Sequence, residues 1–236
     1  MINIEQQREI APTILTSEYE TAQSQLAMVL RLEPRIKRFH IDIITQEFLN
    51  MQQADGKPTL PLEQWKQLLD EADFPNDIPI DVHLMTVDPT QYITACKEIG
   101  AQRVYGHIEH MAKDAQARIE FIAAVTQLGM EAGLALDLAT PLEEISEIID
   151  QTNLSAILFL AVAAGKQGQT FHDEVIEKII QLRALGFTGP ICIDGNMNKD
   201  TIPRCLAAGA TYVGVGSALV RAKDQEQMQQ NWDKLQ

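Results

Sequence analysis

The sequence predicts a single α/β domain folded as a (β/α)8, or TIM, barrel. Eight short β-branched or apolar runs recur along the 236 residues, an amphipathic segment follows each run, and no Pro/Gly/Ser-rich linker interrupts the pattern. Each β-then-α unit takes about thirty residues, the size of a compact βα repeat. An open doubly wound sheet is the alternative, and it is disfavoured because no GxGxxG turn follows the first run.

The eight runs are the predicted strands. Several of them are apolar without alternation, as expected of strands that helices cover. In chain order they are Ile10–Leu15, Arg38–Ile44, Ile78–Met85, Arg103–Glu109, Gly133–Asp137, Ala156–Val162, Pro190–Asp194 and Tyr212–Gly216.

Helix signals fall between the strands. Asp88 and Thr140 are predicted N-caps, each followed by a proline in the first turn. Two segments place apolar residues on one helix face: Leu142, Ile145, Ile148 and Ile149 in one, and Val175, Ile176, Ile179 and Ile180 in the other. Predicted helix ends carry a glycine before the next strand: Gly100, Gly129, Gly186 and Gly209. One connection is unusually long, and we expect a polar loop at 45–61 that serves as a lid or an insert.

Composition excludes several classes of protein. With 19 Lys+Arg against 33 Asp+Glu the net charge is −14, which repels phosphate backbones, so we expect no nucleic-acid partner. The longest apolar run, Leu154–Ala161, is far too short to cross a bilayer, and no secretory signal is visible, so we expect no membrane partner. The three cysteines (Cys96, Cys192 and Cys205) lack metal-type spacing and suit reduced thiols in a cytoplasmic protein.

Four ionisable residues stand at predicted carboxyl ends of strands, where barrel enzymes carry their chemistry: His40, Asp42, His83 and Asp194. Taken singly, a strand histidine is more often a core or surface residue than a ligand, and Asp-Gly is most often a turn. Three strands, however, bring these four side chains to one mouth. Two imidazoles and two carboxylates form a natural site for Zn²⁺, Mn²⁺, Fe²⁺ or Co²⁺, whose charge offsets the repulsion between the carboxylates.

Two glycine-containing segments suggest an anion site. Gly165, Lys166 and Gly168 follow the sixth predicted strand, and Gly214-Val215-Gly216-Ser217 lies at the end of the eighth. Either alone is more often a tight turn, but phosphate sites commonly form near these strands of a barrel. Backbone N–H groups, with Lys166 as a local cation, would then hold an anion that the acidic surface does not attract.

The ordered motifs IAPTIL, FHID, PIDVHLMTVDP, HIE, ATP, CIDG and VGVGSAL resemble ribulose-phosphate 3-epimerases from about Ile10 to Val220. The resemblance implies a TIM barrel that interconverts ribulose 5-phosphate and xylulose 5-phosphate, and a homo-oligomer, either a dimer or a larger ring. It implies one divalent metal ion and no organic cofactor.

Position by position, the resemblance implies roles for the candidate residues. The metal ligands are His40, Asp42, His83 and Asp194, and the two aspartates are also the acid/base pair. Residues implied near the substrate or its phosphate are Thr13, His83, Gly165, Lys166, Gly168, Gly195, Asn196, Gly216 and Ser217. Inversion at C3 of a 2-ketose removes a proton on one face and returns one on the other, which accounts for two carboxylates.

The chain departs from the family pattern around the phosphate. After the sixth predicted strand this chain has AAGKQGQ where the family usually has NPGFGGQ. Asn196 replaces a second glycine after Asp194-Gly195. At the second predicted strand the chain has HIDIITQEF, whereas the family usually has HVDVMDG followed by a phenylalanine. The identity of the ketose phosphate is therefore open, with a hexulose 6-phosphate or another pentulose phosphate as candidates. A non-catalytic sugar-phosphate binder is one alternative. A sugar-phosphate lyase on the same barrel is another, although the lysine of its DxKxxD motif is replaced by His83.

Overall fold

The computed structural model describes residues 9–112, 114–149, 152–163 and 169–236. Within these residues, eight parallel strands pair in sequence order and close into a barrel, because the first strand pairs with the last. The strands are β1 Glu9–Ile14, β2 Phe39–Ile44, β3 Ile80–Met85, β4 Arg103–His107, β5 Glu131–Leu136, β6 Leu154–Leu160, β7 Ile191–Asp194 and β8 Tyr212–Val215. The predicted TIM barrel is confirmed, and each predicted strand overlaps an observed one.

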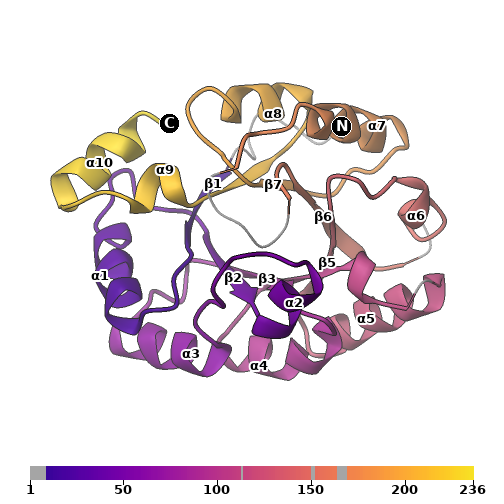
Figure 1. Cartoon of the computed structure of the whole chain (residues 1–236), viewed down its shortest axis with the longest axis horizontal. Coiled ribbons are helices and arrows are strands. Elements are labelled where there is room, and N and C mark those ends of the chain that lie inside the picture. Colours follow the sequence, from indigo (N-terminus) through magenta and orange to yellow (C-terminus); the bar gives the residue numbers. More distant parts are fainter. Residues whose placement is uncertain (1–8, 113, 150–151, 164–168) are drawn as a thin grey trace.

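Helices surround the barrel on its outer side, apart from Gln46–Met51, which lies in front of it (Figure 1). They are α1 Tyr19–Val29, α2 Gln46–Met51, α3 Leu62–Glu71, α4 Ile93–Glu98, α5 Ala115–Gln127, α6 Glu143–Ser146, α7 Glu174–Ala184, α8 Ile202–Ala208, α9 Ser217–Val220 and α10 Gln225–Asp233, with 3-10 turns η2 Pro89–Tyr92 and η3 Ile108–His110. The four glycines predicted at helix ends all have positive φ, as expected of left-handed C-terminal positions.

Two of the predicted helix features are wrong. Thr140 caps no helix, because α6 begins after Leu142 and the Thr140 hydroxyl donates to Glu109 instead. Ile180 is 47% exposed, because the buried face of α7 is formed by Val175, Ile179 and Leu182. The predicted cap Asp88 is confirmed, since its side chain accepts from the Thr90 N–H.

The prediction of a loop at 45–61 needs correction in its first part, because Gln46–Met51 forms α2. Thr45 caps this helix by accepting from the Phe48 N–H, and Phe48 and Leu49 are buried against Ile44 and Met85. The helix therefore packs on the carboxyl ends of β2 and β3, in front of the barrel in Figure 1. Its apolar face is short, so it gives no long periodic signal in the sequence.

Two cores hold the barrel together. The larger lies between the strands and the outer helices, and it contains most of the buried aliphatic side chains. The smaller fills the barrel interior around Tyr105, Leu158 and Tyr212. Gly133 makes room there, because a Cβ at this position would overlap the Tyr105 ring. The interior is therefore a packed core, and barrel enzymes carry their chemistry at its carboxyl-terminal end.

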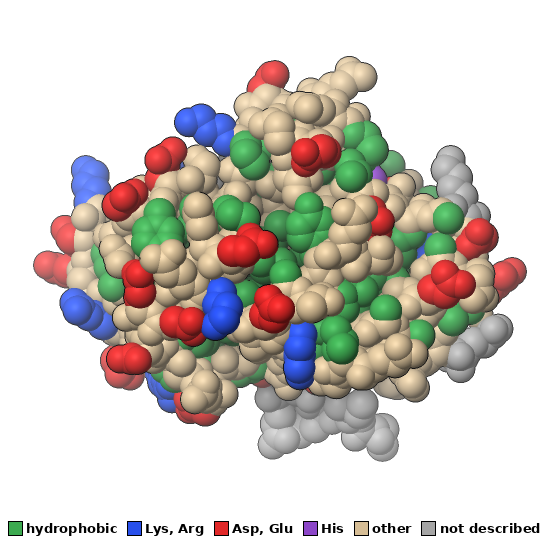
Figure 2. All heavy atoms as spheres, turned by 90° about the horizontal axis from the view of Figure 1, so that it is seen from below, with side chains coloured by type: hydrophobic (Ala, Val, Ile, Leu, Met, Phe, Trp, Pro, Cys, Tyr) green, Lys and Arg blue, Asp and Glu red, His purple; other side chains and the backbone are tan. Residues whose placement is uncertain are grey.

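The surface agrees with the net charge of −14. Acidic side chains are spread over the face seen in Figure 2, with basic side chains between them and no single charged patch. Among the described residues, no helix combines the length and apolarity needed to span a membrane. The three cysteines are buried and unpaired, as their spacing suggests.

Candidate active site

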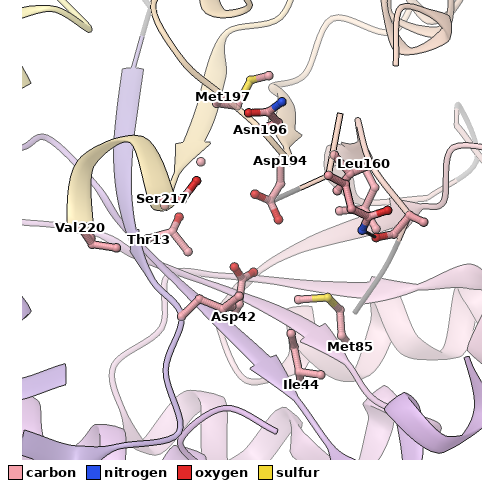
Figure 3. A pocket seen from close by; sticks show the side chains of 17 residues that line it. Thr13, Asp42, Ile44, Met85, Leu160, Asp194, Asn196, Met197, Ser217 and Val220 are labelled. Carbon is pink, nitrogen blue, oxygen red and sulfur yellow. Dashed lines mark hydrogen bonds between the residues drawn. The ribbon is translucent and has the colours of Figure 1, made fainter. Parts of the chain in front are cut away.

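A pocket opens at the carboxyl ends of the strands, and its volume, including the open mouth, is about 740 Å³. Side chains from β1, β2, β3, β6 and the segments after β7 and β8 line it (Figure 3). One wall is apolar, formed by Ile44, Met85, Leu160 and Val162. The pocket lies at the end of the barrel where such enzymes carry their chemistry, and its apolar wall limits the access of water.

The four predicted ligand residues meet at the base of this pocket. His40 and Asp42 come from β2, His83 comes from β3, and Asp194 ends β7. One ligand atom of each lies within 4.8 Å of those of the other three. The barrel produces this convergence because Asp42 and His83 are in register on neighbouring parallel strands. In Figure 3 the carboxylates of Asp42 and Asp194 point toward the same space from different sides.

Both imidazoles face the Asp42 carboxylate. Oδ1 of Asp42 is 3.1 Å from His40 Nε2 and 3.0 Å from His83 Nδ1. His83 Nδ1 is also 3.7 Å from Asp194 Oδ2. Two nitrogens and two carboxylates thus surround one small volume.

A second partner fixes the other nitrogen of each ring. His40 Nδ1 is 2.5 Å from the hydroxyl of Tyr212, and His83 Nε2 is 2.8 Å from Nε2 of His107. Both candidate ligand histidines have no exposed surface, and neither belongs to the pocket lining formed by the described residues. His83, predicted to bind substrate, thus lies behind the lining and contacts the pocket through Asp42.

The pKa values of the two carboxylates move in opposite directions, because the charge of Asp42 acts on Asp194 whereas the two imidazoles act on Asp42. For Asp194, burial and the charge of Asp42 raise the pKa to about 7. Burial also acts to raise the pKa of Asp42, but His40 and His83 outweigh it and hold that pKa below its ordinary value. Without a cation, therefore, one of the two carboxyl groups holds a proton near neutral pH.

The residues present fit a divalent metal ion. Among the described residues, no lysine or arginine forms an ion pair with Asp42 or Asp194, so only the two imidazoles face them. A set of two imidazole nitrogens and two carboxylates suits Zn²⁺, Mn²⁺, Fe²⁺ or Co²⁺. A cation at this position would offset the charge that drives Asp194 to bind a proton.

Neutral residues line another part of the pocket. Gly195, Asn196, Gly216 and Ser217 all line it, and Thr13 lies beside them (Figure 3). Gly195 has φ of 108°, and a Cβ there would lie 2.7 Å from Val162, so the chain can turn after Asp194 only with glycine. Asn196 also has positive φ, which asparagine tolerates better than most residues.

Two further predictions concern residues that would contact the substrate, and the structure describes only the first of them. Thr13 Oγ1 is buried and has no hydrogen-bond partner in the described part of the chain, which leaves it available to a ligand. Gly165, Lys166 and Gly168 lie outside the described residues, so their predicted part in phosphate binding stays a prediction.

Sequence reasoning missed a second group beside this site. His107 Nδ1 is 3.1 Å from Glu109 Oε2 and 3.5 Å from Asp137 Oδ1. The signal was present, because His107 and Glu109 have the same i, i+2 spacing as His40 and Asp42 at the end of a strand. Asp137 likewise follows a strand directly. Tyr212, in contrast, lies within an apolar run that gives no hint of its contact with His40.

Comparison with known proteins gives relatives along nearly the whole chain. The Ribulose-phosphate 3 epimerase family model matches residues 9–220. The chain is 28% identical to Ribulose-phosphate 3-epimerase of Bacillus subtilis, a match covering 92% of this chain and 94% of that one. It is 27% identical to Ribulose-phosphate 3-epimerase of Schizosaccharomyces pombe, over 94% and 91% of the two chains.

Solved structures show the fold at lower identity. A mutant tryptophan synthase alpha-subunit from Pyrococcus furiosus superposes with a TM-score of 0.69 at 16% identity, covering 96% of this chain and 97% of that one. This likeness supports the barrel alone. The match over residues 9–220, together with the curated relatives, gives the family: the chain belongs to the Ribulose-phosphate 3 epimerase family and is an enzyme of the isomerase class.

Proposed function

We propose that this enzyme inverts C3 of a ketose phosphate, with Asp42 and Asp194 as the acid/base pair. The substrate is ribulose 5-phosphate, in equilibrium with xylulose 5-phosphate, or a closely related ketose phosphate. The observation that carries the proposal is the approach of these two carboxylates to one point of the pocket from different strands, with ligand oxygens within 4.8 Å. Curated relatives with this activity support the substrate class.

Each carboxylate has one task in this reaction. One removes the proton from C3, beside the C2 carbonyl, and the other delivers a proton to the opposite face of C3. In the reverse reaction they exchange roles. The apolar wall of Ile44, Met85 and Leu160 keeps bulk water from returning a proton to the wrong face.

We propose that His40, Asp42, His83 and Asp194 hold one divalent metal ion. When bound, the ion supplies positive charge that stabilises the enediolate formed after proton removal. The phosphate would lie at the other end of the pocket, where Gly216, Ser217 and Asn196 offer neutral donors. Thr13 would orient the substrate between the two ends through its unpartnered hydroxyl.

Deuterium exchange tests this function. Purified protein with a divalent metal ion in D₂O should replace the C3 proton of at least one ketose phosphate, followed by NMR as loss of the C3–H signal. The panel comprises ribulose 5-phosphate, xylulose 5-phosphate and hexulose 6-phosphates, and unphosphorylated ribulose is the matched control. Binding without exchange across the panel would indicate a non-catalytic binder. Release of a second product would indicate a lyase, and either result would overturn the proposal.

Metal removal should lower stability more at high pH than at low pH. Because Asp194 has a raised pKa in the metal-free chain, its contribution to stability is fully present below about 3.8 and is lost as pH rises through about 7. A bound cation replaces that proton, so its stabilising effect grows over the same range. At a hundredfold excess over Kd the ion adds about 2.7 kcal/mol, or roughly 5–10 °C in Tm.

Thermal unfolding measures this effect. The difference in Tm between metal-loaded and chelator-treated protein should be larger at pH 8 than at pH 5. Asp194→Asn, which has no proton to displace, is the matched control and should show a smaller dependence on pH. An equal Tm with and without metal at pH 8 would contradict the metal assignment.

A further inference from the structure

His107 lies directly behind the candidate metal ligand His83, on the side away from the pocket. Their Nε2 atoms are 2.8 Å apart, and the two rings stack with centroids 4.9 Å apart and planes 29° from parallel. Both side chains are fully buried. The contact is therefore a hydrogen bond between two imidazoles, with one proton between them.

Glu109 holds the other side of His107. Its Oε1 accepts from the Asp137 backbone N–H at 2.9 Å and from the Thr140 hydroxyl, and its Oε2 is 3.1 Å from His107 Nδ1. Burial acts to raise the pKa of Glu109, but the hydrogen bond and charge of His107, with the hydrogen bonds from Thr140 and the Asp137 N–H, lower it below its ordinary value. Glu109 is thus ionised and, as a carboxylate, can only accept a hydrogen bond from His107.

These contacts determine where the ring protons lie when His83 binds a metal ion. A ligating Nδ1 carries no proton, so neutral His83 bears its proton on Nε2 and donates it to His107 Nε2. His107 Nε2 is then the acceptor, and the His107 proton lies on Nδ1, where Glu109 accepts it. Each ring proton in this series of hydrogen bonds then has an acceptor, whereas the buried Asp137 Oδ1, 3.5 Å from His107 Nδ1, has no hydrogen-bond partner among the described residues.

We propose that His107 is a positioning residue, which together with Glu109 holds His83 in the tautomer and orientation that present an unprotonated Nδ1 to the metal ion. The proposal rests on the metal site of the proposed function and adds to it the residues that prepare one ligand. His40 has a comparable arrangement, because Tyr212 contacts the nitrogen that faces away from Asp42. Second partners of this kind fix the geometry of ligand histidines in metal sites.

A second metal ion beside the first is the competing interpretation. His107, Glu109 and Asp137 also place ligand atoms within 4.8 Å of one another. An ion on His107 Nδ1 would move that ring's proton to Nε2, opposite the Nε2 proton of His83, and two protons cannot share a gap of 2.8 Å. The Lys178 ammonium group also lies close by, where it donates to the carbonyls of Asp137 and Thr140. The short distance between the two imidazoles and the nearby positive charge of Lys178 both favour the series of hydrogen bonds from His83 through His107 to Glu109 over a second ion.

The first test uses unmodified protein loaded with Zn²⁺. Nitrogen-15 NMR of the histidine rings should show the proton of His83 on Nε2 and the proton of His107 on Nδ1. The metal content should be one ion per chain. A His107 ring protonated at Nε2, or two bound ions of which one is lost in Asp137→Asn, would overturn the proposal.

The second test compares variants of His107 by metal affinity, measured by competition with a chelator for Zn²⁺. His107→Phe keeps a ring but removes both nitrogens, and it should weaken binding by about 10- to 100-fold. His107→Gln places an acceptor near the former Nε2 and should recover most of this loss. His172→Gln, at an exposed histidine outside the pocket lining, is the matched control and should bind as the unmodified chain does.

Kinetics separate positioning from substrate contact. Because His107 does not belong to the pocket lining formed by the described residues, KM for the sugar phosphate should stay unchanged in His107→Gln and His107→Phe at saturating metal, while the metal concentration needed for half-maximal kcat rises. Unmodified metal affinity in a folded His107→Phe would overturn the positioning role alone, provided that the unmodified chain still exchanges C3 protons. Absence of both metal binding and exchange in the unmodified chain would overturn the proposed function as well.

Discussion

Asp194→Asn is expected to lower kcat for epimerisation by about 10³-fold or more, because one of the two faces of C3 then has no acid/base group. Asparagine keeps the size of the side chain and an oxygen toward the metal site, so the barrel should fold as before. Epimerisation is measured with the ketose phosphate that shows C3 exchange, at saturating metal. Asp200→Asn is the matched control, since Asp200 lies six residues later on the same side of the barrel and is exposed.

Proton exchange without epimerisation gives a sharper result than loss of turnover. If Asp42 and Asp194 serve opposite faces of C3, Asp194→Asn should still exchange the C3 proton of one epimer with solvent deuterium. Asp42→Asn should exchange the proton of the other epimer, and neither variant should interconvert the two. Exchange of both epimers by either variant, or full epimerase activity in Asp194→Asn, would show that the acid/base assignment is wrong.

Asp81→Asn is expected to destabilise the fold by about 3–5 kcal/mol, although Asp81 is only two residues from His83. Asp81 is fully buried, with one oxygen 2.6 Å from Arg38 Nη1 and the other 3.2 Å from Arg103 Nη1. The neutral amide would leave two nearly buried guanidinium groups facing each other without the shared carboxylate. Denaturant unfolding followed by circular dichroism measures the loss as a fall in the midpoint.

Asp77→Asn is the control for this effect. Asp77 also pairs with an arginine, Arg35 at 2.8 Å, but both side chains are about half exposed or more. An exposed pair contributes little, so the change should cost less than about 1 kcal/mol. Equal effects of the two substitutions would contradict the view that burial makes the Asp81 network important.

The fold was largely predictable because strand burial and helix-end chemistry are local signals. An apolar run such as 156–162 must lie in a core wherever it packs, and a glycine such as Gly209 ends a helix through its own backbone conformation. Helix α2 was missed because its stability comes from contacts of Phe48 with Ile44 and Met85 on other elements. Exposure of Ile180 has a similar cause, since the angle at which α7 packs on the barrel is a tertiary property.

The candidate site was predictable in part for the same reason. His40, Asp42, His83 and Asp194 stand at the carboxyl ends of strands, and in a barrel these ends meet. Contacts between side chains that are distant in the sequence could not be predicted from it. Nothing in the sequence indicates that His107 contacts His83, or that Tyr212 contacts His40, because these residues are 24 and 172 positions apart.

By itself, the sequence determined the order of the eight βα units and the residues that reach the barrel mouth, because the period of two along a strand assigns each side chain to a face. The sequence did not determine how far along the barrel axis each of these side chains lies. Asp81 and His83 share one face of β3, yet His83 lies in register with Asp42 at the pocket, whereas Asp81 lies one layer deeper among arginines. Only the closed barrel decides this difference, because strand register sets which side chains of neighbouring strands share a layer.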